Sequence, residues 1–291
     1  MLFRASQMSD VVTSKTVTRF APSPTGRLHL GHAYSALYAE ASAREMGGRF
    51  LLRIEDIDRT RCRPEFEVAI FEDLAWLGLA WETPVRRQSC HLADYGAALA
   101  RLQEQGTVYP CFCTRRDIQR EINHAGRAPH GRNGLIYPGT CRHLSDEVRR
   151  ARIDAGDAYA LRLDSAAAFA LTGPLTFMDR CYGQVNVNPS LLGDVVVARK
   201  DIGASYHIAV TVDDALQAVS YVTRGEDLFE VTHVHRLLQR LLGLPEPDYA
   251  HHRLLVNVAG ERLAKRDNAA TIQSLRVSGK SAAEVRAAAG F

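Results

Sequence analysis

Apolar residues in the first third of the chain form short continuous runs that alternate with segments of helical spacing. The runs predict strands at residues 16–21 and 49–55. Apolar positions three or four apart predict helices at 31–46, 64–77 and 92–105. Strand, helix, strand, helix is the order of a parallel sheet covered by helices, so we expect an α/β fold.

This pattern breaks after residue 106. The next segment contains three cysteines, several glycines and a loop rich in arginine and histidine. Beyond it the apolar runs return, and they predict strands at 193–199, 205–212 and 218–223, then a helix at 226–242 and a linker at 245–248. The expected organisation is a main domain in two halves, 16–106 and 165–242, an inserted subdomain at 107–164, and a C-terminal region at 243–291.

Composition limits the class of protein. The 291-residue chain is 46% hydrophobic and 24% charged, which is typical of a globular protein with a substantial core. Its formal charge of +3 is mildly basic, so an RNA partner would have to bind a local patch. No apolar run has the length of a signal peptide or a membrane span, and we expect a soluble, cytoplasmic monomer.

The loop after the first predicted strand carries the first candidate chemistry. It reads RFAPSPTGRLHLGH from Arg19 to His32 and leads directly into the first predicted helix. The start of a helix offers unpaired N–H groups and the positive end of its dipole to phosphate. His29 and His32 are three residues apart, so they share one side of the helix start and could donate hydrogen bonds to phosphate oxygens. An isolated pair of this kind would more often be a helix cap or a surface group.

In its full setting, the string FAPSPTGRLHLGHA resembles the HIGH signature of class I aminoacyl-tRNA synthetases, in its glutamyl form. The resemblance implies a Rossmann-type catalytic domain, in which an amino acid is activated by ATP and then transferred to RNA. A second segment, ERLAKRD at 261–267, resembles the KMSKS loop of the same family. Lys265 matches the lysine that neutralises the departing pyrophosphate, whereas Arg262 and Ala264 depart from the family's lysine and serine.

The resemblance also implies individual roles. It makes His29, His32 and Lys265 catalytic and adds ATP, with its Mg²⁺, as a ligand. The implied ATP contacts are Pro22, Ser23, His29, Gly31, His32, Arg262 and Lys265. The implied contacts of L-glutamate are Arg19, Ala21, Ser23, Glu55, Tyr206 and Arg224.

A glutamate site needs arginine for a carboxylate and a protein carboxylate for the ammonium group. Each of these residues also has a plain structural alternative. Glu55 could pair with Arg53 or Arg59, and Arg224 could brace Asp227. Tyr206 could be a core aromatic residue.

The cysteines of the inserted segment form a candidate metal site. A large chain of this kind favours metal binding or free thiols over disulfides, and Cys111 and Cys113 are too close for an easy mutual bridge. With Cys141 they supply three thiolates, and one more ligand would complete a tetrahedral zinc site. The pattern C-x-C, then Y-x3-C, resembles the cluster of a short glutamyl-synthetase relative, which implies Tyr137 as fourth ligand of a structural zinc ion. His124, His130 or His143 could replace Tyr137, and free buried thiols are the alternative.

The acceptor is the last inference from the sequence. Glutamyl-tRNA synthetases carry a helical anticodon-binding region after the KMSKS loop, whereas about 25 residues follow Lys265 here, so we expect no such domain. The chain thus resembles the truncated branch of the family that attaches glutamate to queuosine, the modified first anticodon base of tRNA(Asp). The alternatives are a truncated synthetase that charges the tRNA 3′ end, a silent tRNA-binding paralogue, and another nucleotidyltransferase with an HxGH motif.

Overall fold

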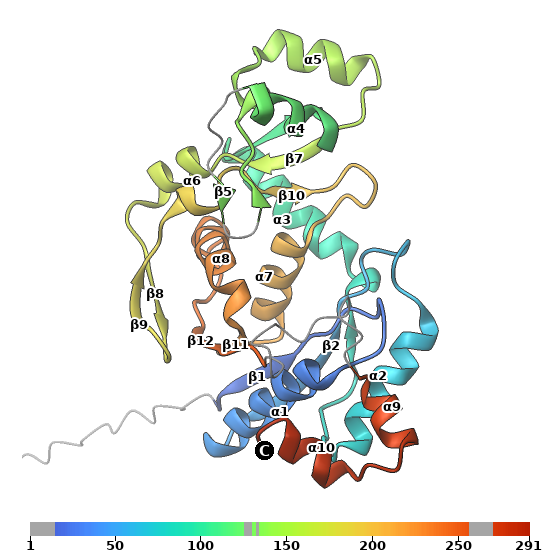
Figure 1. Ribbon diagram of the computed structural model, residues 1–291. Helices are drawn as coiled ribbons and strands as arrows, with labels where there is room; N and C mark the ends of the chain where they lie inside the picture. The colour runs from blue at the N-terminus through green and yellow to red at the C-terminus, as the bar shows by residue number, and fades with distance from the viewer. Residues whose placement is uncertain (1–14, 125–129, 132–133, 256–269) are drawn as a thin grey trace, which may run out of the picture.

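The central sheet is built from two groups of parallel strands (Figure 1). The computed structural model describes residues 15–124, 130–131, 134–255 and 270–291. The first group runs in the order β1 (Val17–Phe20), β2 (Arg49–Ile54) and β3 (Arg86–Arg87), and all pairs are parallel. The second group runs in the order β11, β12, β8, β9, in which only β9 is antiparallel. Its strands are β11 (Tyr221–Gly225), β12 (Asp248–His252), β8 (Thr176–Asp179) and β9 (Gly183–Asn186).

The two groups meet between β1 and β11. The backbone N–H of Ser220 donates to the carbonyl of Val17 at 3.1 Å, and the hydroxyl of Ser220 accepts from the N–H of Val17 at 3.0 Å. The carboxyl ends of β1, β2, β11 and β12 therefore meet at one edge, which is the usual place for a ligand crevice in an open α/β sheet.

Helices cover both faces of this sheet. α1 (Leu30–Glu45) packs on β1, β2 and β11 through alanines that are fully or almost fully buried: Ala33, Ala36, Ala39 and Ala43. Small side chains let this helix approach the strands closely, and the Thr18 hydroxyl donates to the Ala39 carbonyl at 2.8 Å. α7 (Tyr206–Leu216) and α8 (Phe229–Leu241) pack together, and α8 contributes to the core that covers the other face with Val17 and Leu51. The alternation of Phe50, Leu51 and Leu52 between the two cores is the period of two expected of a strand.

The remaining helices frame these two layers. They are α2 (Pro64–Trp76), α3 (Leu92–Glu104), α6 (Ser165–Thr172), α9 (Ile272–Val277) and α10 (Ala282–Ala288), with short 3₁₀ turns at η1 (Gln88–Cys90), η3 (Pro189–Leu191) and η4 (Glu226–Leu228). In the described part of the chain, no helix has the length and apolarity needed to cross a membrane.

The C-terminal helices return to the start of α1. Ile272 donates its backbone N–H to the carbonyl of Leu28 at 2.9 Å, and Thr271 forms a β-bridge with His29. Ile272 is fully buried in the core that contains Leu28 and Leu37. Residues 270–291, which follow the segment 256–269, are thus anchored beside the loop that carries His29.

The inserted segment forms its own antiparallel sheet at the top of Figure 1. This sheet has the order β10 (Val196–Ala198), β7 (Ala160–Leu163), β4 (Val108–Cys111). Around it lie α4 (Arg115–His124), α5 (Asp146–Asp154), the 3₁₀ turn η2 (Thr140–His143) and the small hairpin β5 (His130–Gly131) and β6 (Gly134–Leu135). The sheet includes β10 from beyond residue 164, so the second half of the main domain supplies one of its strands.

Most predicted elements are confirmed, but the strand expected at 205–212 is wrong. These residues begin α7, whose residues from Ile208 to Asp214 are all buried between α3 and α8. A helix buried on all sides has no polar face, so its apolar run imitates a buried strand. The linker expected at 245–248 overlaps the first residue of β12. The strand β12 itself was not predicted, because the histidines of its sequence DYAHH interrupt the apolar run that would indicate a buried strand.

Candidate active site

A cavity of about 450 Å³ opens at the carboxyl edge of the sheet, between the start of α1 and the start of α7. Eight of the predicted ligand contacts line it, namely Arg19, Ala21, His29, Gly31, His32, Glu55, Tyr206 and Arg224. Ser23 lines a neighbouring cavity instead, and Pro22 lines neither. Arg262, Ala264 and Lys265 lie outside the described residues. Leu255 lines the cavity and Thr271 pairs with His29, so the described residues on either side of that segment both border the site.

His29 and His32 together cap the N-terminus of α1. Nδ1 of His29 accepts from the N–H of Gly31 at 3.1 Å, and Nδ1 of His32 accepts from the N–H of His29 at 3.1 Å. A neutral imidazole that accepts at Nδ1 carries its proton on Nε2. The two rings lie 3.8 Å apart between centroids, so the caps fix both Nε2–H groups as a close pair of donors beside the cavity.

Arg224 is held at the end of β11 by neutral groups. Its guanidinium donates to Nε2 of His251 at 3.1 Å and to the hydroxyl of Thr232 at 2.5 Å, and it lies 3.2 Å from Nδ1 of His235. Burial lowers the pKa of both histidines, and the positive charge of Arg224 lowers it further, so both rings are neutral at pH 7. Arg224 is only 6% exposed, and no carboxylate of the described chain forms an ion pair with it. Among the residues that the structure describes, no ion pair joins Arg224 to Asp227, the alternative that the sequence left open.

Asp179 completes this support. Its Oδ2 atom lies 2.5 Å from Nδ1 of His251, and the backbone N–H groups of Cys181 and Tyr182 donate to its Oδ1. Burial alone would raise the pKa of Asp179, but the bond to His251 and the backbone donors keep that pKa below its ordinary value. The ionised carboxylate holds the proton of His251 on Nδ1 and leaves Nε2 as an acceptor for Arg224.

Arg19 lines the same cavity in a different setting. Its guanidinium binds both oxygens of Asp214, at 3.0 and 3.3 Å, and donates to the carbonyl of Thr223 at 3.1 Å. Asp214 also accepts from Arg53 at 2.7 Å, and Arg53 donates to Glu55 at 3.1 Å. The result is a buried row of alternating charges, Glu55, Arg53, Asp214 and Arg19, with Arg53 fully buried at its centre.

Glu55 and Tyr206 separate the first cavity from a second one. The second cavity has a volume of about 860 Å³ and lies between the sheet edge and the inserted segment. Five cationic side chains line it: Arg61, Arg115, Arg162, Arg199 and Lys200. Its acidic lining residues are Glu55, Asp58 and Asp201, and both aspartates are bound to Arg199. Glu55 and Tyr206 line both cavities, so the two cavities lie next to each other and share these side chains as a wall.

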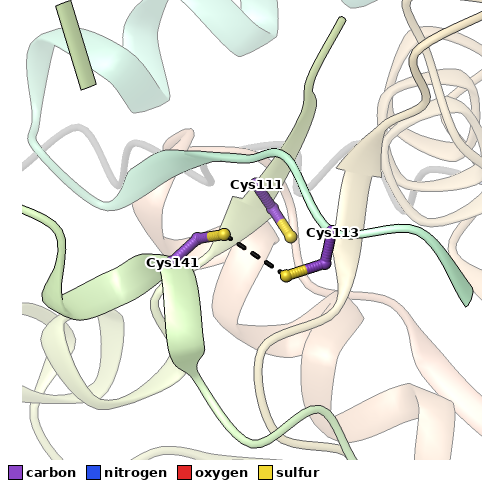
Figure 2. Close-up of side chains that lie close together, drawn as sticks. All are labelled: Cys111, Cys113 and Cys141. Carbon is purple, nitrogen blue, oxygen red and sulfur yellow. Dashed lines mark hydrogen bonds between the residues drawn. The ribbon is translucent and has the colours of Figure 1, made fainter. Parts of the chain in front are cut away.

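The three cysteines of the inserted segment converge, as Figure 2 shows. The Sγ atoms of Cys111, Cys113 and Cys141 all lie within 4.8 Å of one another, a spacing that could hold a metal ion. The Tyr137 hydroxyl lies 3.5 Å from the sulfur of Cys111 and 3.6 Å from that of Cys113. Three thiols and one phenol thus present four donors around one point, the number that a tetrahedral zinc site requires.

None of the three histidines considered as the fourth ligand is placed at the cysteines by the described residues. His143 is not part of this metal-ligating group, which contains only cysteines among the described residues. The side chains of His124 and His130 lie outside the described part. Tyr137 also accepts the N–H of Cys141 at 2.8 Å, and this bond places its oxygen against the thiols. The residues that the sequence assigned to the cluster are therefore the ones that meet.

Sequence reasoning missed the residues that support the site. Asp179, Thr232, His235 and His251 around Arg224, and Asp214 beside Arg19, were not singled out. The adjacent acidic pair Asp213–Asp214 and the histidines of β12 and α8 were a possible signal, because buried polar residues need partners. Their partners lie more than ten positions away in most cases, so the pairing itself was not visible in the sequence.

Comparisons with known proteins agree with this geometry. Residues 15–286 match the family model of the class I tRNA synthetases (E and Q), catalytic domain. The chain is 49% identical to a glutamyl-Q tRNA(Asp) synthetase of Rhodobacter capsulatus, over 94% of this chain and all of that relative. It is 41% identical to a glutamate–tRNA ligase 2 of Acidithiobacillus ferrooxidans, over 94% of this chain but only 57% of that one.

A solved structure shows the same fold. The glutamate tRNA ligase of Elizabethkingia meningosepticum, in complex with its amino acid, superposes with a TM-score of 0.74 at 30% identity. The match covers 87% of this chain and 52% of that ligase, so the chain spans about half the length of this relative. The chain belongs to the class I tRNA synthetases of the E and Q type, and within them to the glutamyl-Q tRNA(Asp) synthetases.

Proposed function

We propose that this chain activates L-glutamate with ATP as glutamyl-adenylate and transfers the glutamyl group to queuosine of tRNA(Asp). The observation that carries the glutamate part is the setting of Arg224. A buried guanidinium held only by neutral acceptors is costly unless an anion joins it. A substrate carboxylate in the first cavity supplies that anion, and a planar guanidinium matches its two oxygens.

The other lining residues suit the rest of the amino acid. Glu55 places a carboxylate at the wall of the cavity, where it attracts the substrate ammonium group, and Tyr206 lies beside it. Arg19, Ala21 and Ser23 remain proposed contacts from the family resemblance. With its side-chain carboxylate on Arg224 and its ammonium on Glu55, glutamate keeps its α-carboxylate for attack on the α-phosphate of ATP.

The histidine pair suits the triphosphate. The Nε2–H groups of His29 and His32 are fixed donors, and fixed donors stabilise charge that grows on phosphate oxygens in the transition state. In this proposal Pro22, Ser23 and Gly31 shape the loop around ATP with its Mg²⁺, and Arg262 and Lys265 act on the pyrophosphate. The pyrophosphate leaves as the bond between the glutamate oxygen and the α-phosphorus forms.

The second cavity suits the acceptor. Its cationic lining favours an RNA backbone, and it adjoins the glutamate site, with which it shares Glu55 and Tyr206 as lining residues. Relatives named glutamyl-Q tRNA(Asp) synthetase reach 49% identity, which supports queuosine of tRNA(Asp) over the tRNA 3′ end. A hydroxyl of the acceptor would attack the glutamyl carbonyl and release AMP.

The cysteine cluster suits a structural zinc ion. Cys111, Cys113, Cys141 and Tyr137 would hold it, and the ion would link β4 to the turn η2. These four ligands would fill a tetrahedral ion's coordination and leave no open position for a substrate, so the ion's contribution would be to the fold of the inserted segment.

Two assays with the purified chain test this proposal. Glutamate-dependent exchange of pyrophosphate into ATP, with and without tRNA, tests the activation step. Transfer of labelled glutamate to tRNA(Asp) with and without queuosine, resolved on acid gels, tests the acceptor. We expect labelling of the queuosine-containing tRNA alone. Charging of queuosine-free tRNA(Glu) would contradict the acceptor, and absence of exchange under both conditions would leave a silent tRNA-binding paralogue.

A further inference from the structure

Two cations of the second cavity are attached to the cysteine cluster. Lys200 donates from Nζ to the carbonyl of Phe112 at 2.8 Å, and Phe112 is the residue between Cys111 and Cys113. Arg162 lies over the ring of Tyr137, with its Cζ atom 3.8 Å from the ring centroid. Both cations line the second cavity, together with the sulfur-bearing residues Cys111 and Cys113.

These two side chains keep their charge available. Lys200 uses one of its three N–H donors on the Phe112 carbonyl. Arg162 donates from one terminal nitrogen to the backbone carbonyl of Asp194 at 2.6 Å. Neither forms an ion pair with a carboxylate among the residues that the structure describes.

Their neighbour Arg199 provides the contrast. It binds both oxygens of Asp201, at 3.0 and 2.6 Å, and a third carboxylate oxygen, of Asp58, at 2.9 Å. Arg199 lines the same cavity and precedes Lys200 in the chain, but its charge is already compensated within the protein. An anion that enters the cavity therefore meets Lys200 and Arg162 without a carboxylate partner in the described part of the chain, as it does Arg61 and Arg115, and of these four only Lys200 and Arg162 touch the cysteine cluster through the contacts above.

We propose that Lys200 and Arg162 bind the RNA phosphates in the second cavity and that the cysteine cluster, with a zinc ion bound, holds them in place for this purpose. The inference rests on the proposed function, because it assumes an RNA acceptor and a bound zinc ion. A flexible lysine loses rotamer freedom when it binds a phosphate, and the bond to the Phe112 carbonyl removes part of that cost in advance. The stacked Tyr137 ring does the same for the plane of Arg162.

Coupling between the two sites is reciprocal. If the cluster with its ion favours the RNA-binding arrangement of Lys200 and Arg162, bound RNA must favour retention of the ion to the same degree. RNA should then raise the affinity of the protein for zinc, so a competing chelator removes less of it at equilibrium. Typical coupling free energies correspond to a change of about 5- to 150-fold in affinity.

The experiment measures zinc release at equilibrium, as the partition of zinc between the protein and a chromogenic chelator, with and without queuosine-containing tRNA(Asp). Wild-type protein should bind zinc at least about fivefold more tightly when RNA is bound. The Lys200→Gln and Arg162→Gln variants should lose most of this protection. The matched control is Arg199→Gln, which removes a charge from the same wall and should keep it.

Binding and folding are measured separately. Fluorescence anisotropy gives the RNA affinity of each variant, so release is compared at saturating RNA. Arg162→Lys keeps the charge without the planar stack and should retain only part of the protection. Zinc content and thermal melting show whether each variant is folded.

Equal protection in wild type, Lys200→Gln and Arg162→Gln overturns the inference, and so does RNA binding that leaves zinc release unchanged. A purified chain without zinc overturns it as well. Glutamate-dependent pyrophosphate exchange distinguishes these results from failure of the proposed function, because the activation step takes place in the first cavity.

Discussion

Arg19 and Arg224 line the same cavity and are almost equally buried, yet their surroundings have opposite character. Arg19 is bound through two hydrogen bonds to the carboxylate of Asp214, which also binds Arg53. Arg224 is bound to two neutral histidines and a threonine hydroxyl. The first arginine belongs to a compensated charge network within the protein, whereas the second keeps a net positive charge for a ligand.

Arginine therefore has two roles here, one in stabilising the fold and one in binding a ligand. Removing a member of a compensated buried network leaves a partner charge without its counter-ion, so the folded state is penalised. Removing the uncompensated Arg224 takes away a charge that only the substrate neutralises, so binding is penalised. Substitutions on the two sides should therefore divide cleanly between stability and activity.

The largest effect is expected for Arg224→Gln. Loss of a buried, charge-assisted contact to a carboxylate should lower kcat/KM for glutamate by about 100- to 1,000-fold, or about 3–4 kcal/mol. The melting temperature should change little, because no protein carboxylate loses its partner. Pyrophosphate-exchange kinetics at varied glutamate measure the first quantity and thermal unfolding the second. A loss of less than about tenfold would remove Arg224 from the glutamate site.

The matched substitution Arg19→Gln should act mainly on the fold. It leaves Asp214 with Arg53 as its remaining cationic partner, and we expect a loss of about 3 kcal/mol in the free energy of unfolding. Denaturant unfolding at pH 7 measures this loss. If Arg19→Gln left stability intact and abolished glutamate binding alone, the proposed contrast between the two arginines would not hold.

Acid should lower the free energy of unfolding through the buried histidine His233. Burial, and next repulsion from His251 once acid protonates that ring, lower the pKa of His233 to about 4, below the ordinary value of 6.5. The folded state then binds fewer protons than the unfolded state, so the contribution is complete above pH 6.5 and is lost as the pH falls from 6.5 to about 4. We expect a loss of about 2 kcal/mol over this range from His233.

The control for this pH dependence is His233→Asn, which keeps an acceptor for the backbone N–H of Asn188. Unfolding titrations between pH 7 and pH 4 should give a shallower slope for this variant than for wild type. An unchanged slope would mean that His233 takes up protons equally in the folded and unfolded states.

The smallest effect is expected for Asp179→Asn, which acts on Arg224 through His251. An amide no longer holds the His251 proton on Nδ1, so Nε2 is less available as an acceptor for Arg224. We expect KM for glutamate to rise about tenfold, with KM for ATP nearly unchanged. Equal increases in both constants would indicate a general loss of structure rather than misplacement of Arg224.

The sequence predicted the parts of the fold and site that depend on local patterns. Helix α1 and the flanking strands β1 and β2 follow from an apolar run, a proline-rich loop and a helical period that lie within about 40 residues. The cysteine pair and Tyr137 could be assigned because their spacing resembles a known cluster. α7 was misread because its buried surroundings remove the polar face that marks a helix.

By itself, the sequence determined which chemical groups are present and which family's chemistry they resemble, since motifs and spacing are properties of neighbouring residues. Only the tertiary structure decided that Arg19 is paired with Asp214, 195 positions away, while Arg224 is not paired with a carboxylate in the described chain. It also decided that Lys200 and Arg162 meet the cysteine cluster at the wall of a cavity. The physical reason is that the charge a side chain offers to a ligand depends on its burial and on partners that folding brings from distant positions.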